Sequence, residues 1–551
     1  MWLINTTTRE LEYFVNPDKG SYAILSHTWG DGEVSFQEYR AREEFQHKEG
    51  MDKINMTCVL ASAWGLQYAW VDTCCIDKQS SAELSEAINS MFQWYKGSAV
   101  CFAYLSDLSH NVDFQDSAGF PACNWLKRGW TLQELIAPEH VEFYDQAWTK
   151  RGTKIENEGF IAETTRIDGK VLRDSAVLSL TPVAKRMFWA SARKTTRIED
   201  LAYCLMGIFD IHMPMIYGEG SKSFMRLQEE IAKQSCDRSL FAWTAQPLAG
   251  EGNQAFRGMF ARSPAEFSSC SRIRSRHSMG AFEGLIQKEF TITNKGVGIK
   301  TMLVGTSATG DSIFNLGLTE DLLPRITDTR GWIGIYLTKT PLGFVRSRSS
   351  ERYTAGADQR TVLDKKIIHI RKDVSPSESA SLWAFCWRWA VHLRPFAYGE
   401  LADMAVMPTE LWDRQRRLFL DQGSGINSYA LLKFAAQPGI HRQFRAVVAC
   451  STMNCRLCSV WTEQDRLFRD VCDHLEHRTE LSDYVAVDYL RVYFCRELPG
   501  DTTECTARFH DDQTGYQIVV SVKLTIDQYN GAHGYFLSVQ KQVLHVDRMV
   551  S

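Results

Sequence analysis

Hydrophobic and polar positions alternate in blocks along the first 150 residues. Four short apolar segments turn polar at their C-terminal ends, which is typical of buried parallel strands; they are 22–29 (YAILSHTW), 68–73 (YAWVDT), 99–105 (AVCFAYL) and 140–145 (HVEFYD). Between them, apolar residues recur at helical spacing in segments 51–65 and 80–96, and Ser80 with Glu83 has the pattern of a capping box. This alternation predicts an α/β fold with a parallel sheet between two layers of helices.

The segment RGWTLQELIAP at 128–138 belongs to a predicted helix near 125–137 that ends before Pro138. Its apolar face carries Leu132, Leu135 and Ile136, while Trp130 and Glu134 share the other face. From the pattern alone, Glu134 is expected at the surface of an amphipathic helix and Trp130 in the core. The alternative is that this face belongs to a functional site.

The second half of the chain has a different period. Turn-forming residues predict a linker at 246–256, after a first α/β domain at 1–165 and a helical extension at 166–245. From 257 to 551, alternating apolar positions predict a β-rich sandwich or barrel; the clearest segments are 290–300, 331–337, 484–494, 517–526 and 535–543.

Composition narrows the possible environments. Of 551 residues, 44% are hydrophobic and 23% charged, and the net charge of -4 without a basic stripe argues against a nucleic-acid partner. No apolar stretch reaches the roughly 18 residues of a membrane span, and the first residues lack a signal-peptide core. Fifteen cysteines, an odd number with Cys74 and Cys75 adjacent, indicate free thiols in a reducing, cytoplasmic setting.

Polar residues follow three of the predicted strands. In a parallel sheet, ligands bind at the carboxyl ends of the strands. The candidate binding residues there are Ser26, His27, Thr28, Trp29, Asp72, Thr73, Cys74, Cys75, Asp77, Ser106 and Asp107. Each of them alone is explained by a strand end meeting water or by a helix cap, whereas the whole set favours a site.

Two cysteine hypotheses remain open. Cys455, Cys458, Cys472 and His477 have a spacing compatible with a structural zinc site, although free thiols in a β domain explain the same residues. Cys74 and Cys75 are a possible nucleophilic pair, but no neighbouring base or helix terminus is evident in the sequence. No phosphate-binding glycine loop of standard spacing occurs.

Three blocks of the chain resemble the fungal heterokaryon incompatibility (HET) domain. They are YAILSHTWGDGEVSFQEY, WVDTCCIDKQSSAELSEAINSMFQWYKGSAVCFAYLSD and RGWTLQELIAP, and the segment RIEDLAYCLMGIFDIHMPMIYGEGSKSFMRLQEEI resembles what commonly follows this domain. The resemblance covers about the first 245 residues. It implies a role in fungal non-self recognition and programmed cell death.

The HET domain in turn resembles TIR domains, which have a flavodoxin-like α/β fold. Catalytic TIR domains carry a helix block of the type W-C-x-x-E-L, whose Glu cleaves the nicotinamide glycosidic bond of NAD. Here the block reads Trp130-Thr131-Leu132-Gln133-Glu134-Leu135, with Thr131 in place of the cysteine. The resemblance therefore implies that Glu134 is catalytic, that NAD is the substrate, and that the active form is a homo-oligomer.

The chemistry is compatible with a single carboxylate. Nicotinamide leaves NAD as a neutral molecule, so no general acid is required, unlike in ordinary glycoside hydrolysis. One carboxylate can stabilise the positive charge that develops on the ribose. The expected binding residues are Ser26, His27, Trp29, Asp72, Thr73, Asp77 and Trp130, where Trp29 stacks on a ring, Trp130 is an apolar wall, and Asp72 and Asp77 bind ribose or only order the loop.

No cofactor is required by this mechanism. Because no nucleotide-switch motif is present, the expected partner is an upstream sensor protein. The alternatives are a non-catalytic interaction module that recruits cell-death partners, in which Glu134 is structural, and metal-free hydrolysis of another nucleotide.

Overall fold

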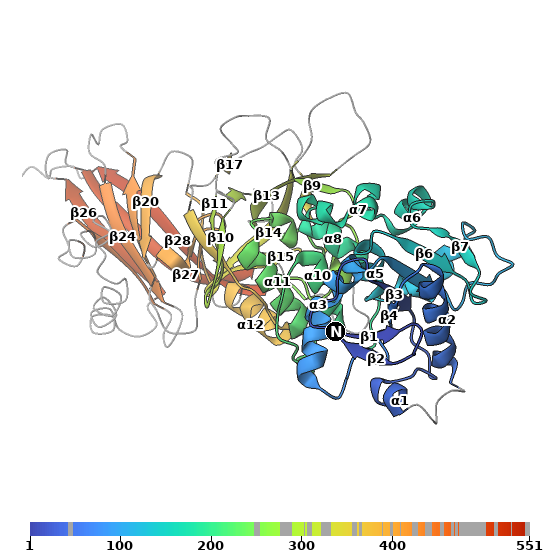
Figure 1. Ribbon diagram of the computed structural model, residues 1–551. Helices are drawn as coiled ribbons and strands as arrows, with labels where there is room; N and C mark the ends of the chain where they lie inside the picture. Colours follow the sequence, from blue (N-terminus) through green and yellow to red (C-terminus); the bar gives the residue numbers. More distant parts are fainter. Residues whose placement is uncertain are drawn as a thin grey trace, which may run out of the picture.

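A computed structural model describes most of the chain. The described residues are 1–41, 48–246, 254–275, 289–301, 303–305, 311–320, 332–354, 361–362, 366–387, 390–396, 401–407, 409–420, 428–435, 444–451, 457–463, 468, 472, 503–511, 516–529 and 532–545. They form an elongated molecule in which an N-terminal α/β region, a middle β region and a C-terminal β region follow one another (Figure 1).

The N-terminal region is built on a mixed sheet whose strand order is β2-β1-β4-β3-β5-β6-β7. The strands are β1 (Trp2–Asn5), β2 (Leu11–Tyr13), β3 (Tyr22–His27), β4 (Tyr68–Trp70), β5 (Val100–Tyr104), β6 (Val141–Tyr144) and β7 (Lys150–Thr153). The four predicted strands, β3 to β6, pair in parallel as expected. The prediction of a wholly parallel sheet is wrong, because β1 pairs antiparallel with β2 and β4, and β7 antiparallel with β6.

Helices on both sides of this sheet agree with the apolar pattern. The elements are α1 (Phe36–Ala41), α2 (Glu49–Ala63), α3 (Ser81–Gly97), η1 (Phe120–Ala122), α4 (Asn124–Lys127) and α5 (Thr131–Ile136). Helices α2 and α3 lie on opposite sides of the strands (Figure 1). The Ser80 hydroxyl caps α3 by accepting a 3.3 Å hydrogen bond from the backbone N–H of Glu83. The single helix expected near 125–137 is instead two short helices, α4 and α5.

A group of short helices packs beside α3 and α5. They are α6 (Glu158–Thr165), α7 (Gly169–Arg173), η2 (Ser175–Leu180), α8 (Val183–Ala190), α9 (Asp200–Tyr203), α10 (Met206–Phe209), α11 (Lys222–Gln234) and η3 (Arg238–Phe241). Gly207 lets α10 approach α3, since a Cβ atom there would lie 2.2 Å from Cβ of Phe92. This packing joins the helical extension to the α/β core.

The middle β region is a second sheet in the order β10-β11-β18-β15-β14-β13-β12-β17, with β16, β8 and β9 pairing beside it. Its elements are β8 (Phe256–Arg257), η4 (Pro264–Phe267), β9 (Ile273–Ser275), β10 (Phe290–Thr293), β11 (Gly296–Thr301), β12 (Leu303–Gly305), β13 (Ser312–Glu320), β14 (Ile333–Thr340), β15 (Gly343–Ser347), β16 (Tyr353–Thr354), β17 (Thr361–Val362), β18 (Lys366–Ile370) and α12 (Pro376–Trp387). One hydrophobic core runs from the N-terminal sheet into this region.

A buried arginine holds the middle sheet against the end of the helical extension. Arg346 on β15 is fully buried, and its guanidinium carbon lies 3.8 Å from the ring centre of Trp243. The same guanidinium donates hydrogen bonds to the backbone carbonyls of Phe241, at 3.0 Å, and Trp243. Planar stacking with two directed donors is a role that suits arginine rather than lysine.

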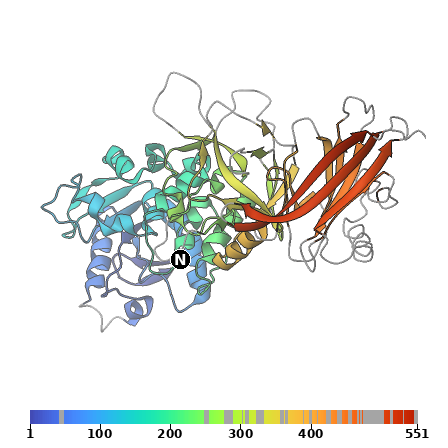
Figure 2. The same ribbon diagram turned by 180° about the vertical axis from the view of Figure 1, so that it is seen from behind.

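The C-terminal β region is a sandwich of two further sheets, β21-β22-β19-β28-β27-β26 and β20-β23-β24-β25. Its elements are β19 (Val391–Leu393), β20 (Leu401–Met407), η6 (Thr409–Leu411), β21 (Trp412–Asp413), β22 (Leu418–Phe419), β23 (Ser428–Phe434), β24 (Phe444–Ser451), β25 (Leu457–Thr462), β26 (Glu504–Asp511), β27 (Tyr516–Tyr529) and β28 (Ala532–His545). A separate hydrophobic core lies between them. Figure 2 shows β27 and β28 as the two long red strands.

The prediction of a β-rich second half is confirmed. The segment 290–300 is a hairpin of β10 and β11, and the segments 331–337, 517–526 and 535–543 correspond to β14, β27 and β28. In β27, Ile518, Val520, Val522 and Leu524 are buried as their alternation predicts. The segment 484–494 and most of the expected linker, 247–253, lie outside the described residues. The domain boundaries stay predictions.

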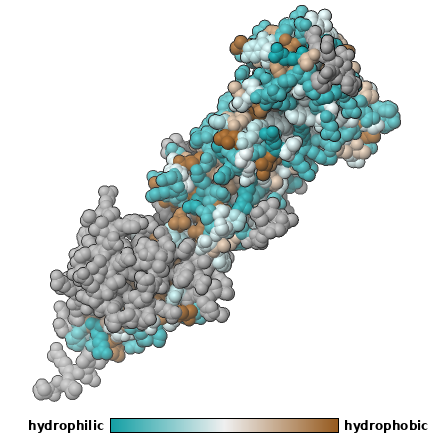
Figure 3. All heavy atoms as spheres, turned by 90° about the horizontal axis from the view of Figure 1, so that it is seen from below, coloured by the Kyte–Doolittle hydropathy of each residue, from teal (hydrophilic) through white to brown (hydrophobic). Residues whose placement is uncertain are grey.

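The surface, the helices and the cysteines of the described part of the chain bear on the environment predicted from the composition. On the face in Figure 3, hydrophobic side chains are scattered among hydrophilic ones, as is usual for protein surfaces. None of the helices in the described part of the chain is long and apolar enough to cross a membrane. Every cysteine that the structure describes is a free thiol. Of the proposed zinc ligands, Cys455 and His477 lie outside the described residues, and Cys458 is buried in β25.

Candidate functional site

The polar ends of β3 and β5 meet at one edge of the N-terminal sheet. In space the parallel strands run β4-β3-β5-β6, so the chain leaves β3 and β5 in opposite directions. Such a reversal opens a crevice at the carboxyl ends of the two strands, where α/β proteins bind ligands. The hydroxyls of Thr28, after β3, and Ser106, after β5, lie 3.3 Å apart across this point.

Glu134 lies at this edge in a small hydrogen-bonded cluster. The Ser26 hydroxyl, near the end of β3, donates to Oε2 of Glu134 and accepts a 2.8 Å hydrogen bond from the indole N–H of Trp125. We call Glu134, Ser26 and Trp125 the Glu134 cluster. Glu134 is only 6% exposed, so the interpretation of this residue as a surface side chain on an amphipathic helix is wrong.

The helical extension packs against α5, the helix that carries Glu134. All six residues of α5 are buried. The guanidinium of Arg193 donates to the hydroxyl of Thr131 and to the carbonyl of Arg128, both at 2.8 Å. Beside this contact the N–H of Gly129 donates to the carbonyl of Lys194 at 2.8 Å. Residues 193 and 194 therefore pack against the start of α5, although they lie about 60 positions away in the sequence.

A glycine is needed where these segments touch. A Cβ atom on Gly129 would lie 2.6 Å from the methyl group of Thr195, well inside van der Waals contact. This explains why the block begins with the sequence Arg-Gly-Trp, since a larger residue in place of Gly129 would push residues 194 and 195 away from α5.

The surroundings of Glu134 raise the pKa of its carboxyl group to near neutral pH. Burial raises the pKa of Glu134 to about 7, and the charge of Arg128 and the hydrogen bond from Ser26 partly oppose this increase. The nearby Asp72 carboxylate adds to the increase, and Arg193 opposes it. Near pH 7 the carboxyl group therefore exists in both its neutral and its ionised form.

A second cluster surrounds the exposed Trp29. The carboxylate of Asp72 accepts hydrogen bonds from Nε2 of His27, at 3.0 Å, and from the indole N–H of Trp29, at 2.9 Å. Nδ1 of His27 lies 3.4 Å from the Lys53 ammonium, which can only donate. Nδ1 also lies 3.7 Å from Oε1 of Glu33, while Nε2 donates to Asp72. We call Trp29, Asp72 and His27 the Trp29 cluster.

Two cations lie against the Trp29 ring. The Lys78 ammonium is 3.7 Å and the Arg128 guanidinium carbon 5.0 Å from the ring centre. Arg128 also donates a 3.1 Å hydrogen bond to the carbonyl of His27, so it lies between the two clusters. Burial would raise the pKa of Asp72, but the hydrogen bond from His27 and the charges of His27, Lys78 and Arg128 outweigh it and lower that pKa. An exposed ring flanked by cations is suited to binding an anionic group.

Two of the predicted binding residues, Asp77 and Trp130, have other contacts, and a third, Thr73, is buried. Asp77 accepts hydrogen bonds from the Gln37 amide, at 2.6 Å, and the backbone of Gln79, at 2.9 Å, and so orders its own loop. The indole N–H of Trp130 lies 3.4 Å from Asp200 in the helical extension, and its ring packs on the core. The hydroxyl of Thr73 is buried with no hydrogen-bond partner among the described residues.

The geometry does not favour a thiol nucleophile. Cys74 and Cys75 are both buried. Burial raises the pKa of Cys74 well above its ordinary value, which suppresses the reactive thiolate.

Five residues of the site escaped the sequence interpretation. They are Trp125, Arg128, Arg193, Lys53 and Lys78. Arg128 stands within the block that contains Glu134, so a search for cations near the carboxylate would have found it. Arg193 and Lys53 lie on elements whose contact with the site depends on the tertiary fold, and no local pattern marks them.

Comparisons with known proteins concern the same part of the chain. Residues 22–119 match the family described as heterokaryon incompatibility protein (HET). The vegetative incompatibility protein HET-E-1 of Podospora anserina is 47% identical over 222 residues, which make up 38% of this chain and 16% of that protein. The chain thus matches less than a fifth of the length of this relative. No solved structure gives a significant match.

Proposed function

Since the chain carries a HET domain, we propose that it is an effector of heterokaryon incompatibility that cleaves the nicotinamide glycosidic bond of NAD at Glu134. One observation carries the catalytic part of the proposal. A nearly buried carboxyl group with a pKa of about 7 lies at the carboxyl edge of a parallel sheet, beside cations and an exposed aromatic ring. Perturbed carboxyl groups at such edges are typical of active sites.

The reaction needs one carboxylate and water. The bond between C1′ of the ribose and the nicotinamide nitrogen breaks, and its electron pair leaves with nicotinamide, which becomes neutral. Ionised Glu134 stabilises the positive charge that develops on the ribose. Water then adds at C1′ and releases a proton, which gives ADP-ribose.

In this proposal, the Glu134 cluster and the Trp29 cluster bind different parts of NAD. The nicotinamide ribose lies at the Glu134 cluster, where the Ser26 hydroxyl orients the carboxylate. The pyrophosphate lies by Arg128 and Lys78, because these cations flank the exposed Trp29 ring. His27 and Asp72 position Trp29 and take no part in the proton balance.

Access to Glu134 makes activation part of the proposal. At 6% exposure, the carboxylate in the single chain is almost covered. The residues around the crevice must therefore move before the ribose reaches it. We assign this movement to self-association of the chain, which an upstream sensor protein promotes.

The test is release of nicotinamide from NAD by the purified chain at low and high protein concentration. The native chain and Glu134→Gln are compared, with Glu142→Gln as the matched control. Glu142 is a second buried glutamate of the N-terminal region, at 5% exposure on β6, bonded to Tyr144 and Lys150. Nicotinamide release that is lost only in Glu134→Gln, and that rises steeply with concentration, supports the proposal. Equal release by Glu134→Gln and the native chain contradicts it.

A second candidate is a non-catalytic module that recruits cell-death partners. The observation in its favour is the closed hydrogen bonding of Glu134 with Ser26, which also suits a purely structural carboxyl group. Cell killing that persists in a folded Glu134→Gln variant favours this candidate over the enzyme.

A further inference from the structure

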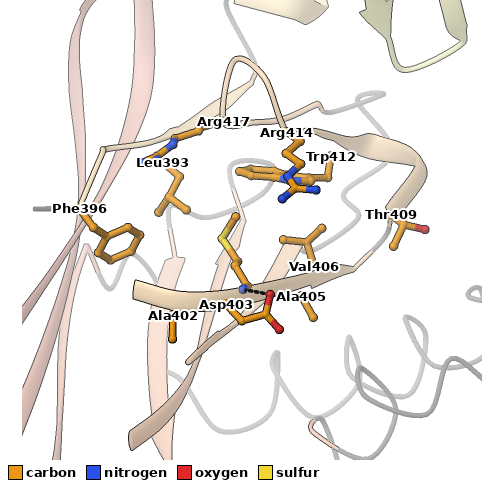
Figure 4. Close-up of a pocket in the computed structure, with 11 residues that line it drawn as sticks. Leu393, Phe396, Ala402, Asp403, Ala405, Val406, Thr409, Trp412, Arg414 and Arg417 are labelled. Carbon is orange, nitrogen blue, oxygen red and sulfur yellow. Dashed lines mark hydrogen bonds between the residues drawn. The ribbon is translucent and has the colours of Figure 1, made fainter. Parts of the chain in front are cut away.

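A pocket of about 480 Å³ opens in the C-terminal sandwich, far from the HET domain in the sequence. It lies between β20 and the turn that connects β21 to β22, and Figure 4 shows the side chains of both elements around it. Pockets of several hundred Å³ accommodate small organic molecules.

One part of the pocket is apolar and aromatic. Val406 on β20 and Trp412 on β21 are buried at 9% and 8% exposure, and Phe396 is half-buried beside them. In Figure 4, Val406 faces Trp412 across the hollow, and Phe396 bounds it on one side. These walls suit a flat or aliphatic body, which would otherwise expose apolar area to water.

The β21–β22 turn supplies the charge. Its four residues, 414–417, divide into two pairs. Gln415 and Arg416 face the middle β region, where they donate hydrogen bonds to the carbonyls of Asp311, at 2.7 Å, and Lys339, at 2.6 Å. Arg414 and Arg417 instead line the pocket, and both are exposed.

Arg417 is available to a ligand. Its side chain has no hydrogen bond or ion pair within the described residues, and its backbone is left-handed, with φ of 51°. The turn holds this conformation, which is uncommon for a residue other than glycine, and so fixes where the side chain starts. The one carboxylate among the lining residues, Asp403, already accepts a hydrogen bond from the backbone of Met404 at 2.8 Å.

We propose that this pocket binds an organic anion with an apolar, flat body and one carboxylate, sulfonate or phosphate group. The body packs against Trp412, Val406 and Phe396. The anionic group binds Arg414 and Arg417, whose guanidinium groups match its oxygens with charge-assisted hydrogen bonds. A cation of the same shape is repelled by the two arginines.

The test is calorimetric titration of the full chain with 2-naphthoate and, as a neutral probe of the same shape, 2-naphthamide. We expect saturable binding of 2-naphthoate that is weaker by about tenfold or more for 2-naphthamide, the usual effect of a hydrogen-bonded charge. The variant Arg414→Gln/Arg417→Gln loses the preference for the carboxylate. Arg508→Gln, which removes an exposed arginine from β26 of the same sandwich, keeps it.

Three results overturn the proposal. They are an absence of saturable 2-naphthoate binding to the native chain, equal affinity of the native chain for the two probes, and an unchanged preference in the double variant. The probe comparison on the native chain decides the matter even if the double variant does not fold. Since no NAD is present, the result is independent of the proposed catalytic activity.

Discussion

The hydroxyl of Ser26 donates a hydrogen bond to the carboxylate of Glu134, although 108 residues separate them in the sequence. The same hydroxyl accepts from the indole N–H of Trp125. A single small side chain at the end of β3 thus satisfies two buried polar groups that arrive from α4 and α5. This connection orients the carboxylate and favours its ionised form.

Removing the Ser26 hydroxyl tests whether it stabilises the fold and whether it favours the ionised form of Glu134. In Ser26→Ala, the indole N–H of Trp125 loses its partner while still buried, so we expect the free energy of unfolding to fall by about 1–3 kcal/mol. The pKa of Glu134 rises as well, and the midpoint of any pH–rate profile moves to higher pH. Urea denaturation and the profile measure the two effects. Ser26→Thr, which retains a hydroxyl, is the control, and an unchanged unfolding free energy in Ser26→Ala contradicts the role of the bond.

The raised pKa of Glu134 predicts a stability that falls with increasing pH. A carboxyl group with a folded pKa of about 7 and an ordinary value of 4.5 stabilises the fold fully below the ordinary value. This contribution is lost as pH rises through about 7, and its full size is about 3 kcal/mol. Glu134→Gln lacks this titration. The difference in unfolding free energy between native chain and variant should therefore shift by about 3 kcal/mol from about pH 4 to about pH 9, and a constant difference contradicts the assignment.

The lowered pKa of Asp72 predicts a dependence of stability on pH that is opposite to that of Glu134. The pKa of Asp72 is lowered in the folded chain, so its contribution is present above the ordinary value of 3.8 and is lost as pH falls below it. In Asp72→Asn, an amide N–H₂ replaces one of the two oxygens that accept from His27 and Trp29. We expect a loss of about 1–3 kcal/mol at neutral pH, measured by urea denaturation, that shrinks in acid. A variant as stable as the native chain at pH 7 excludes this role.

The buried contacts of Arg346 predict a large loss of stability when this residue is replaced, although it lies outside the Glu134 and Trp29 clusters. Arg346→Lys keeps the charge but loses the planar stacking on Trp243 and one of the two carbonyl contacts. The free energy of unfolding should fall by about 2–3 kcal/mol, because a buried carbonyl is left unpaired. Arg272→Lys, at an exposed arginine of the same region, is the control and should stay within about 0.5 kcal/mol of the native chain. Equal stability of the two variants contradicts the argument.

The hydrophobic pattern predicted the parts of the fold whose neighbours are local in sequence. The apolar runs at 22–29, 68–73, 99–105 and 140–145 contain the four parallel strands, and Ser80 caps α3 as expected. The strands β1, β2 and β7 were not predicted. Strands β2 and β7 contain no buried residue, so no apolar run marks them, and β1 has only four residues. The HET resemblance, read from three blocks of sequence, is confirmed.

The environment of Glu134 was not predictable in the same way. Helical spacing correctly assigned Leu132, Leu135 and Ile136 to the core. It placed Glu134, on the opposite face, at the surface, because the pattern of one helix carries no information on what a distant segment covers. The contacts of Glu134 come from Ser26 on β3, which also binds Trp125 on α4, and Arg193 packs beside them through its hydrogen bond to Thr131. The pKa of Glu134 is therefore a property of the tertiary fold.

The turn from Arg414 to Arg417 contributes both to the junction with the middle β region and to the pocket in the C-terminal sandwich. Gln415 and Arg416 hold the junction with the middle β region, and Arg414 and Arg417 face the pocket. If an occupant of the pocket strengthens that junction, thermodynamic linkage requires that a firmly held junction strengthens the occupant's binding by the same factor. Occupancy of the pocket would then change how firmly the C-terminal sandwich is held against the middle β region.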